Sequence, residues 1–521
     1  MKRKIQLNLG NNKIKEQEIN YIPIRYIIAF MITIFEVLAI IGVMVLLCMH
    51  VPYFYFAVGI TTFIVELTII ASDNNPDYKI PWILIVLTIP VAGLMLCLIF
   101  GSRKLKKKYI KRLEDLKSLS YKKDDAALLK QLEQEDIIAS NQAKILINIS
   151  DSHLFTNTKQ TYYPSGEEYH QALLKDLKNA KKFIYLEYFI IEEGEFWNSI
   201  LDILKEKVKQ GLDIKLTFDD IGCMSTLPGN YSKQLKKYGI EATPFSRLKG
   251  QADNEFNNRN HRKITVIDGI IGYTGGINIA DEYINKKSRF GHWKDAGIRL
   301  EGEAVWELTK LFLIDFGINI HTPLTLPEKL YPTCQNKENG YVIPFGDGPK
   351  PLYKWRVGKT IIQNMLDTAS KYVYITTPYL IIDNELCTSI ENAALRGVDV
   401  KIIVPHIPDK KIIFNMTKSY YKRFIENGVK IYEYEPGFIH AKTYISDDKY
   451  AIDGTINLDY RSLVHHFENG VWLYNCDCIK DIKNDINDTL SKSIEIQPQM
   501  LKTNIFNRFF RALVKIFAPM L

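Results

Sequence analysis

Two stretches of the chain repeat one constellation of polar residues. In each, a His-x-Lys triplet is followed by an Asp five residues after the Lys, and then by a Gly that opens a Gly-x-x-Asn group. The first set is His261, Lys263, Asp268, Gly275 and Asn278; the second is His440, Lys442, Asp447, Gly454 and Asn457. Equivalent residues are all separated by the same interval, which indicates a duplicated domain.

The residue types in this pattern suit chemistry on a small anion. Residues two apart on a strand face the same way, so each His and its Lys are expected on one face. An imidazole can act as a nucleophile or as a general acid and base, while a lysine and an asparagine amide can stabilise an oxyanion. Phosphate is therefore the natural ligand. A single His-x-Lys more often marks an exposed strand face, but two copies with the same Gly and Asn spacing favour a site.

The aspartates and glycines of the pattern admit more specific expectations. Asp268 precedes Gly269 between two apolar runs, and Asp447 precedes Asp448, which is typical of hairpin turns. We interpret both aspartates as turn residues that organise the site, with direct participation in the chemistry as the alternative. The glycines Gly275, Gly276 and Gly454 are expected to let the backbone approach the phosphate closely.

A metal centre is the rival interpretation of paired histidines. Each histidine is accompanied by a lysine, whose charge repels a metal ion and attracts an oxyanion. Seven cysteines without regular spacing, including Cys476 and Cys478, do not form a zinc pattern or a disulfide framework. The sequence thus predicts no metal and no other cofactor.

Strands and helices alternate around both motifs. Residues 181–190 and 212–220 are predicted as strands on either side of a helix over 196–211, and 371–381 and 398–405 flank a helix over 384–397 in the same order. This alternation predicts an α/β fold of two duplicated halves, each with a mixed sheet flanked by helices. We place the first half at 141–325, a linker rich in Pro and Gly at 326–354, and the second half at 355–495.

The first hundred residues are predicted to contain a membrane segment. Three apolar runs, 26–48, 51–71 and 82–100, approach the length of about 17–25 residues that crosses a bilayer. Basic residues on both flanks, in 1–25 and 103–108, favour the cytosol for both, which requires an even number of crossings. Either one run is re-entrant, and Pro81 and Pro90 make the third run the candidate, or one flank violates the rule.

Two charged segments complete the domain plan. Residues 103–140 are predicted as a solvated helical linker, and 496–521 as an amphipathic tail on an anionic membrane surface. In the tail, Phe506, Phe509, Phe510, Leu513, Val514 and Phe517 form one helical stripe, and Arg508, Arg511 and Lys515 form another. A helix packed on the core is the alternative. The net charge of +8 suits a phospholipid surface, a nucleic acid or an acidic substrate.

Together these motifs resemble the phospholipase D superfamily, whose members close one active site from two His-x-Lys-x4-Asp motifs. The segments "NHRKITVIDGIIGYTGGINIADEY", "AALRGVDVKIIVP" and "GVKIYEYEPGFIHAKTYISDD" resemble bacterial cardiolipin synthases more closely. Substitutions in "DGTINLDYRS" and "VHHFENG" remove none of the motif residues. The resemblance extends from about residue 82 to the carboxyl terminus.

The resemblance implies a reversible two-step phosphatidyl transfer between two phosphatidylglycerol molecules that yields cardiolipin and glycerol. His261 is the implied nucleophile and His440 the implied acid and base. A further acid in each half would fix its histidine; Asp295 and Glu468 occupy suitable positions, and Glu468 is expected to orient His440. An ordinary salt bridge is the alternative for both acids.

The apolar runs and their basic flanks predict a multi-pass protein of the cell membrane with its catalytic halves on the cytoplasmic face. The resemblance implies phosphatidylglycerol as donor and acceptor, and an anionic bilayer is the expected surface. A lipid hydrolase or another phosphatidyltransferase remains an alternative, as does a membrane-anchored nuclease. The membrane segment and the modest net charge count against nucleic acid as a partner, for which a basic groove with aromatic platforms would be expected. Oligomeric state is left open.

Overall fold

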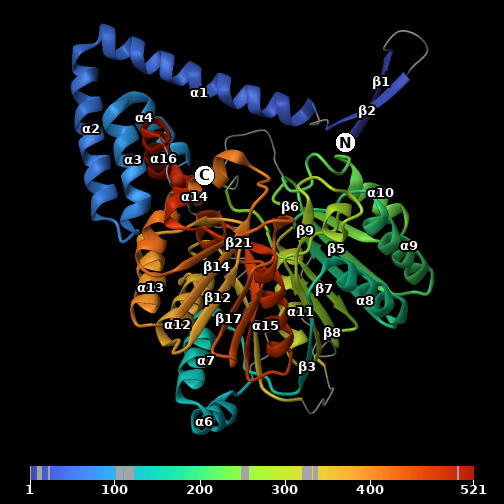
Figure 1. Cartoon of the computed structure of the whole chain (residues 1–521). Helices are drawn as coiled ribbons and strands as arrows, with labels where there is room; N and C mark the ends of the chain where they lie inside the picture. The colour runs from blue at the N-terminus through green and yellow to red at the C-terminus, as the bar shows by residue number, and fades with distance from the viewer. Residues whose placement is uncertain are drawn as a thin grey trace.

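The computed structural model describes residues 2–8, 14–20, 24–100, 110, 123–247, 257–319, 331–332, 338–501 and 504–520. A hairpin of β1 (Lys2–Asn8) and β2 (Ile14–Asn20) precedes α1 (Ile24–His50) and α2 (Pro52–Ala71). Both helices are long and apolar enough to cross a membrane. They project from the body formed by the two sheets, to which the shorter α3 and α4 lie closer (Figure 1).

The third apolar run is not one spanning helix. It is divided between α3 (Pro76–Thr88) and α4 (Pro90–Phe100), which break at Ile89. Proline has no N–H to donate and drives the preceding residue out of the helical region, as the extended φ of −135° at Ile89 shows. Among the described residues two helices can span, and a break at Pro90 is what the re-entrant alternative requires.

The first half is built on a sheet ordered β3-β10-β8-β7-β4-β5-β6. Parallel pairing joins β4 (Phe183–Tyr188), β5 (Asp213–Asp219) and β6 (Glu241–Phe245), and the remaining pairs are antiparallel. The antiparallel strands are β3 (Thr158–Tyr163), β7 (Ile264–Ile267), β8 (Ile271–Gly275) and β10 (Gly297–Gly302). The helices are α8 (Gly166–Asn179), α9 (Glu195–Lys209), α10 (Tyr231–Lys237) and α11 (Val305–Asn319).

The second half repeats this order as β11-β20-β18-β17-β12-β14-β15 and adds β21 at the edge. Its strands are β11 (Tyr341–Asp347), β12 (Tyr372–Thr376), β14 (Asp399–Pro405), β15 (Lys430–Tyr434), β17 (Thr443–Ser446), β18 (Tyr450–Gly454), β20 (Glu468–Tyr474) and β21 (Ser493–Glu495). Its helices are α12 (Val357–Thr368), α13 (Asn384–Leu395), α14 (Lys411–Glu426) and α15 (Cys478–Ser491). The predicted α/β fold with two mixed-sheet halves is confirmed.

Two segments lie elsewhere than their place in the sequence suggested. β11 falls inside the predicted linker but pairs with β20, and it tolerates Pro344 because it is the edge strand. The helix α6 (Ala126–Glu135) lies in the predicted helical linker, and α7 (Ile137–Ser150) covers its end and the predicted start of the first half, yet α7 contacts α12 and β11 of the second half. Gln142 of α7 accepts a hydrogen bond from the indole of Trp472.

Backbone pairing joins the two halves directly. The short β9 (His292–Lys294) of the first half pairs in parallel with β16 (Gly437–Ile439) of the second. Asn260 and Phe467 form a second parallel bridge between the halves. An apolar cluster that includes Ile298 and Leu300 from the first half and Val471 and Leu473 from the second continues across this contact.

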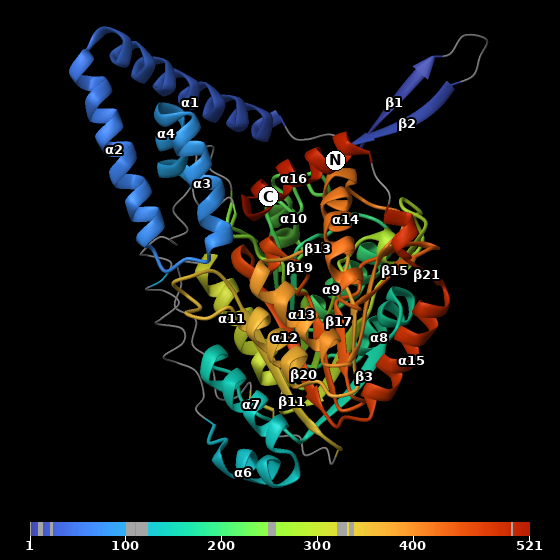
Figure 2. The same ribbon diagram turned by 60° about the vertical axis from the view of Figure 1, so that its left-hand side comes forward.

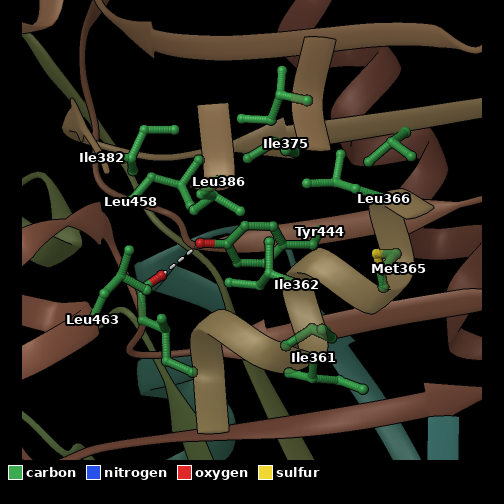
Figure 3. Packing of buried hydrophobic residues seen from close by; sticks show 14 of the residues in the cluster. Ile361, Ile362, Met365, Leu366, Ile375, Ile382, Leu386, Tyr444, Leu458 and Leu463 are labelled. Atoms are coloured by element: carbon green, nitrogen blue, oxygen red, sulfur yellow. Dashed lines mark hydrogen bonds between the residues drawn. The ribbon is translucent and has the colours of Figure 1, made fainter. Parts of the chain in front are cut away.

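The second half also has a core of its own beneath its helices. Figure 3 shows Ile361, Ile362, Met365 and Leu366 of α12 packed against Tyr444 and the strands. The Tyr444 hydroxyl donates to the Ile456 carbonyl at 2.8 Å, so this buried ring keeps its hydrogen bond. That bond ties the strand after His440 to the segment that carries Asn457.

Candidate active site

The two histidines lie where the halves pair, each just before an inner strand of its sheet. His261 precedes β7, and its N–H donates to the Phe467 carbonyl at 2.9 Å. His440 precedes β17, and its N–H donates to the Lys294 carbonyl at 2.6 Å. Each motif is therefore held by backbone hydrogen bonds to the opposite half.

Each histidine is oriented by a carboxylate of the other half. The Nδ1 atom of His261 lies 2.9 and 3.0 Å from the two Glu468 oxygens, and Nδ1 of His440 lies 2.7 Å from Asp295 Oδ2. The expectation that Glu468 orients His440 was wrong. Asp295 directly follows the residue that pairs with Ile439, so the β9 and β16 register sets it beside His440. The bridge between Asn260 and Phe467 sets Glu468 beside His261 in the same way.

Burial keeps both imidazoles neutral. Desolvation lowers the pKa of His261 to about 3 and that of His440 to about 4, although the neighbouring carboxylates oppose the shift. Both carboxyls remain ionised despite their burial, because the histidine beside each lowers its pKa. Nδ1 of each ring faces an ionised carboxylate, which favours the proton on Nδ1 and leaves Nε2 as the free base. At His440 this carboxylate, Asp295, competes for Nδ1 with the nearby Lys442 Nζ.

Both lysines are buried next to their histidines. Lys263 Nζ donates to the His261 carbonyl at 2.6 Å, and Lys442 Nζ lies 2.7 Å from His440 Nδ1. Desolvation lowers the pKa of Lys263 to about 7 and that of Lys442 to about 8. Lys442 contributes to the shift of Lys263, and Lys263 to that of His440, so charges from the two motifs act within one site.

The two asparagines sit differently. Asn278 accepts from the Ile190 N–H at 3.0 Å and donates to the Tyr283 hydroxyl at 2.7 Å, and the Tyr283 ring lies 5.5 Å from that of His440. The side-chain oxygen of Asn457 is buried and has no hydrogen-bond partner among the described residues. Asn278 of the first half thus lies on the His440 side of the site.

The two motif aspartates lie at the other end of their strands. Asp268 has a φ of 56° and follows β7; its carboxylate accepts from the N–H groups of Lys181, Lys182 and Phe183. Asp447 has a φ of 55° and accepts in the same way from 370–372. A four-residue strand, roughly 13 Å long, separates each aspartate from its histidine. This geometry matches the turn interpretation and leaves both aspartates outside the reacting group.

The glycines of both motifs are closely packed against neighbouring protein atoms. A Cβ on Gly276 would lie 2.0 Å from Asp295 Oδ1, so glycine at this position admits the carboxylate that orients His440. Gly275 and Gly454 pair with Gly297 and Gly470, and a Cβ on either would meet the opposite backbone. These contacts explain why glycine stands at the three positions, and the expected contact of their backbone with phosphate stays a prediction.

Three polar residues around Glu468 were not singled out from the sequence. Thr455 and Ser462 both donate to the Glu468 carboxylate, the latter at 2.6 Å, and Nδ1 of the buried His466 lies 3.6 Å from it. Thr455 stands at the position equivalent to Gly276, inside the motif, and this difference between the copies was the available signal. Ser462 and His466 are brought in by the turn before β20, which motif spacing does not reveal.

His261, His466 and Glu468 also form a group by residue type that could hold a metal ion, with ligand atoms within 4.8 Å of one another. The Glu468 oxygens already accept from His261, Thr455 and Ser462. We therefore assign this cluster to hydrogen bonding that orients the histidine.

Similarity to known proteins agrees with this geometry. The family described as "Cardiolipin synthase, PLD-like domain" matches residues 173–289 and 362–490. A cardiolipin synthase of Halalkalibacterium halodurans is 31% identical, over 89% of this chain and 93% of its own length. The chain belongs to the cardiolipin synthase family. Cardiolipin synthase 2 of Bacillus anthracis is 32% identical over 89% of this chain and 90% of its own. An uncharacterised protein of Streptococcus mutans is 42% identical over 87% of this chain and 99% of its own length.

A solved structure supports the fold. The crystal structure of phosphatidylserine synthase from Haemophilus influenzae superposes with a TM-score of 0.55 at 17% identity, over 73% of this chain and 98% of that one. The cardiolipin synthase family lies within the phospholipase D superfamily, and this member is a phosphatidyltransferase of phospholipid biosynthesis, with phospholipid substrates.

Proposed function

We propose that the protein converts two phosphatidylglycerol molecules into cardiolipin and glycerol through a phosphatidyl-histidine intermediate. The observation that carries this proposal is the reciprocal pairing of His261 with Glu468 and of His440 with Asp295. The pairing gives one site two neutral imidazoles, each with an Nε2 free to act. One imidazole can bond to phosphorus while the other moves a proton.

In the first step, His261 Nε2 attacks the phosphorus of one phosphatidylglycerol and the bond from phosphorus to the glycerol headgroup breaks. The imidazolium of His440 donates its Nε2 proton to the leaving glycerol oxygen. Bound phosphodiester, an anion beside His440, favours this charged form over the neutral one of the empty site. Lys263 and Lys442 stabilise the charge that grows on the non-bridging oxygens.

In the second step, a hydroxyl of another phosphatidylglycerol gives its proton to His440 and attacks the same phosphorus. The bond from phosphorus to His261 Nε2 then breaks, which frees cardiolipin and restores the enzyme. Both exchanges replace one phosphodiester with another, so the reaction is reversible. We assign the nucleophile to His261 because that is the role its motif takes in the family.

We further propose a multi-pass protein with its catalytic halves on the cytoplasmic face. Supporting this are the spanning lengths of α1 and α2 and the basic residues before α1. The tail helix α16 (Ile505–Phe517) would lie in the bilayer surface, because Phe506, Phe509 and Leu513 are 72%, 68% and 46% exposed.

The test is to reconstitute the full chain in vesicles with labelled phosphatidylglycerol as the only phospholipid substrate and to resolve the products. We expect cardiolipin and free glycerol in equal amounts. Phosphatidic acid as the sole lipid product would replace the synthase proposal with a hydrolase. A His261→Ala and His440→Ala double variant controls for contaminating activity.

A further inference from the structure

Two neighbouring cavities lie on the side of the second half that faces α3 and α16. The larger, of about 380 Å³, is lined by residues that include Asp77, Ile80, Tyr420, Tyr460, Ala512 and Lys515. Its size falls within the roughly 300–1,000 Å³ typical of ligand sites. A smaller cavity of about 70 Å³ is lined mainly by apolar side chains, among them Tyr379, Ile413, Met416 and Ala518.

Tyr460 belongs to the walls of both cavities. It follows Asp459, which lines the smaller cavity two residues after Asn457. At the other wall, the Tyr379 ring lies 6.4 Å from that of Phe438, whose ring lies 5.9 Å from that of His440. Through these contacts the smaller cavity connects the larger one to the second-half segments that carry His440 and Asn457.

The larger cavity adjoins the apolar surfaces that we place at the membrane. α16 contacts both α3 and α14, and all three helices lie together on one side of the second half (Figure 2). Ile80 and Leu87 of α3 are 47% and 55% exposed, next to the exposed phenylalanines of α16. Acyl chains lying along these helices would bring a headgroup to the cavity.

The polar groups of the larger cavity match such a headgroup. Lys515 Nζ lies 4.3 Å from the centre of the Tyr420 ring, and within the described residues it forms no ion pair, so its charge is available to a phosphate. The cation of Arg423, by contrast, is held by Glu391 at 2.8 Å. The Asp77 carboxylate accepts from the Asn384 N–H and the Tyr460 hydroxyl through Oδ2, which leaves Oδ1 as an acceptor for a hydroxyl group.

We propose that the larger cavity is a docking site for an intact anionic phospholipid, with its phosphate at Lys515 and its hydroxyl-bearing headgroup near Asp77. The lipid enters from the bilayer between α3 and α16 and passes Tyr460 to the histidines. This inference rests on the proposed function, because the docked lipid is the substrate of that site.

The test compares two substrates with full-length protein in vesicles: phosphatidylglycerol diluted in neutral lipid, and a soluble phosphodiester without acyl chains. Total phosphatidylglycerol consumed is recorded whatever the product, so a failed synthase assignment shows in the product and a failed docking site shows in the KM. Lys515→Met is expected to raise the KM for phosphatidylglycerol about tenfold, which is the loss of one charged contact, about 1.4 kcal/mol. Turnover of the soluble diester is expected to change less than about twofold.

Arg508→Met is the matched control, since it removes one cation from α16 at a residue that lines neither cavity. α1 and α2 anchor both variants, so a general loss of membrane attraction would affect them equally. Equal increases in KM for the two variants would overturn the docking site.

Ile413→Trp, which fills the smaller cavity, should lower lipid turnover about tenfold relative to turnover of the soluble diester. The same substitution at the exposed neighbour, Ile412→Trp, should not. Equal effects of these two would overturn the path past Tyr460.

Discussion

The two halves share a strand order and a motif, yet they hold their motif histidines differently. His261 is held by Glu468, whose carboxylate also accepts from Thr455 and Ser462. His440 is held by Asp295, whose other oxygen accepts from its neighbouring N–H, that of Ala296.

The difference lies at one position of the repeat. Where the second half has Thr455, the first has Gly276, and the space of the missing side chain is filled by Asp295. In the second half, Thr455 donates a hydroxyl hydrogen bond to the Glu468 carboxylate. In the first half, Gly276 has no side chain and so leaves room for the Asp295 carboxylate. A duplicated motif can therefore supply two imidazoles with distinct roles while its backbone stays the same.

Removal of either motif histidine should have the largest effect on activity. We expect His261→Ala and His440→Ala each to lower cardiolipin synthesis by at least about 10⁴-fold, because one loses the nucleophile and the other the acid and base. A phosphodiester with a p-nitrophenolate leaving group needs no proton, so His440→Ala should still release one equivalent in a burst and His261→Ala none. A burst from His261→Ala instead would reverse the assigned roles.

The crossed pairing can be tested by neutralising the carboxylates without changing their shape. Glu468→Gln and Asp295→Asn should each lower synthesis by about 10²- to 10³-fold, since an amide no longer favours the active tautomer. On the p-nitrophenyl substrate, Glu468→Gln should lose the burst, like the His261 variant, and Asp295→Asn should keep it. The opposite pattern would show that each acid serves the histidine of its own half.

Alanine at the two equivalent positions should have unequal effects. Gly276→Ala places a methyl group on the Asp295 carboxylate and should lower turnover by about 10²-fold. Thr455→Ala only removes one donor to Glu468, a loss of about 1.5 kcal/mol or roughly tenfold. Steady-state kinetics on folded protein, verified by circular dichroism, measures the ratio; equal losses would contradict the asymmetry.

The lysines offer the smallest and most graded contrast. Their lowered pKa values mean that each is charged below, and neutral above, about 7 for Lys263 and about 8 for Lys442. As pH rises through each of these pKa values, a lysine loses the charge that stabilises the phosphate, and kcat/KM should fall severalfold. Arginine stays charged, so Lys263→Arg should remove the fall near pH 7 and Lys442→Arg the one near pH 8. A single fall near pH 10 would contradict these shifts. The nucleophile His261 adds no acid limb above about pH 5, since its pKa is lower still.

Much of this architecture could be predicted from the sequence, because the patterns that specify it are local. Alternating apolar runs predicted β4, β5, β12 and β14, and spacing paired the motif residues across the duplication. The partners of the histidines could not be predicted in that way. They depend on the register between β9 and β16 and on the single bridge at Asn260, which are contacts between distant segments of short, irregular strands. β11 shows the same limit, since its Pro344 suggested a linker but is accommodated at the edge of the sheet.

The parallel pairing of β9 with β16 has one more consequence. Because each of the two motif histidines pairs with a carboxylate of the opposite half, neither half alone contains a complete site. Both halves belong to one polypeptide, so the site assembles at an effective concentration set by the connecting chain and not by the amount of protein in the membrane. Specific activity should therefore stay constant when the enzyme is diluted among excess vesicles, even to one molecule per vesicle.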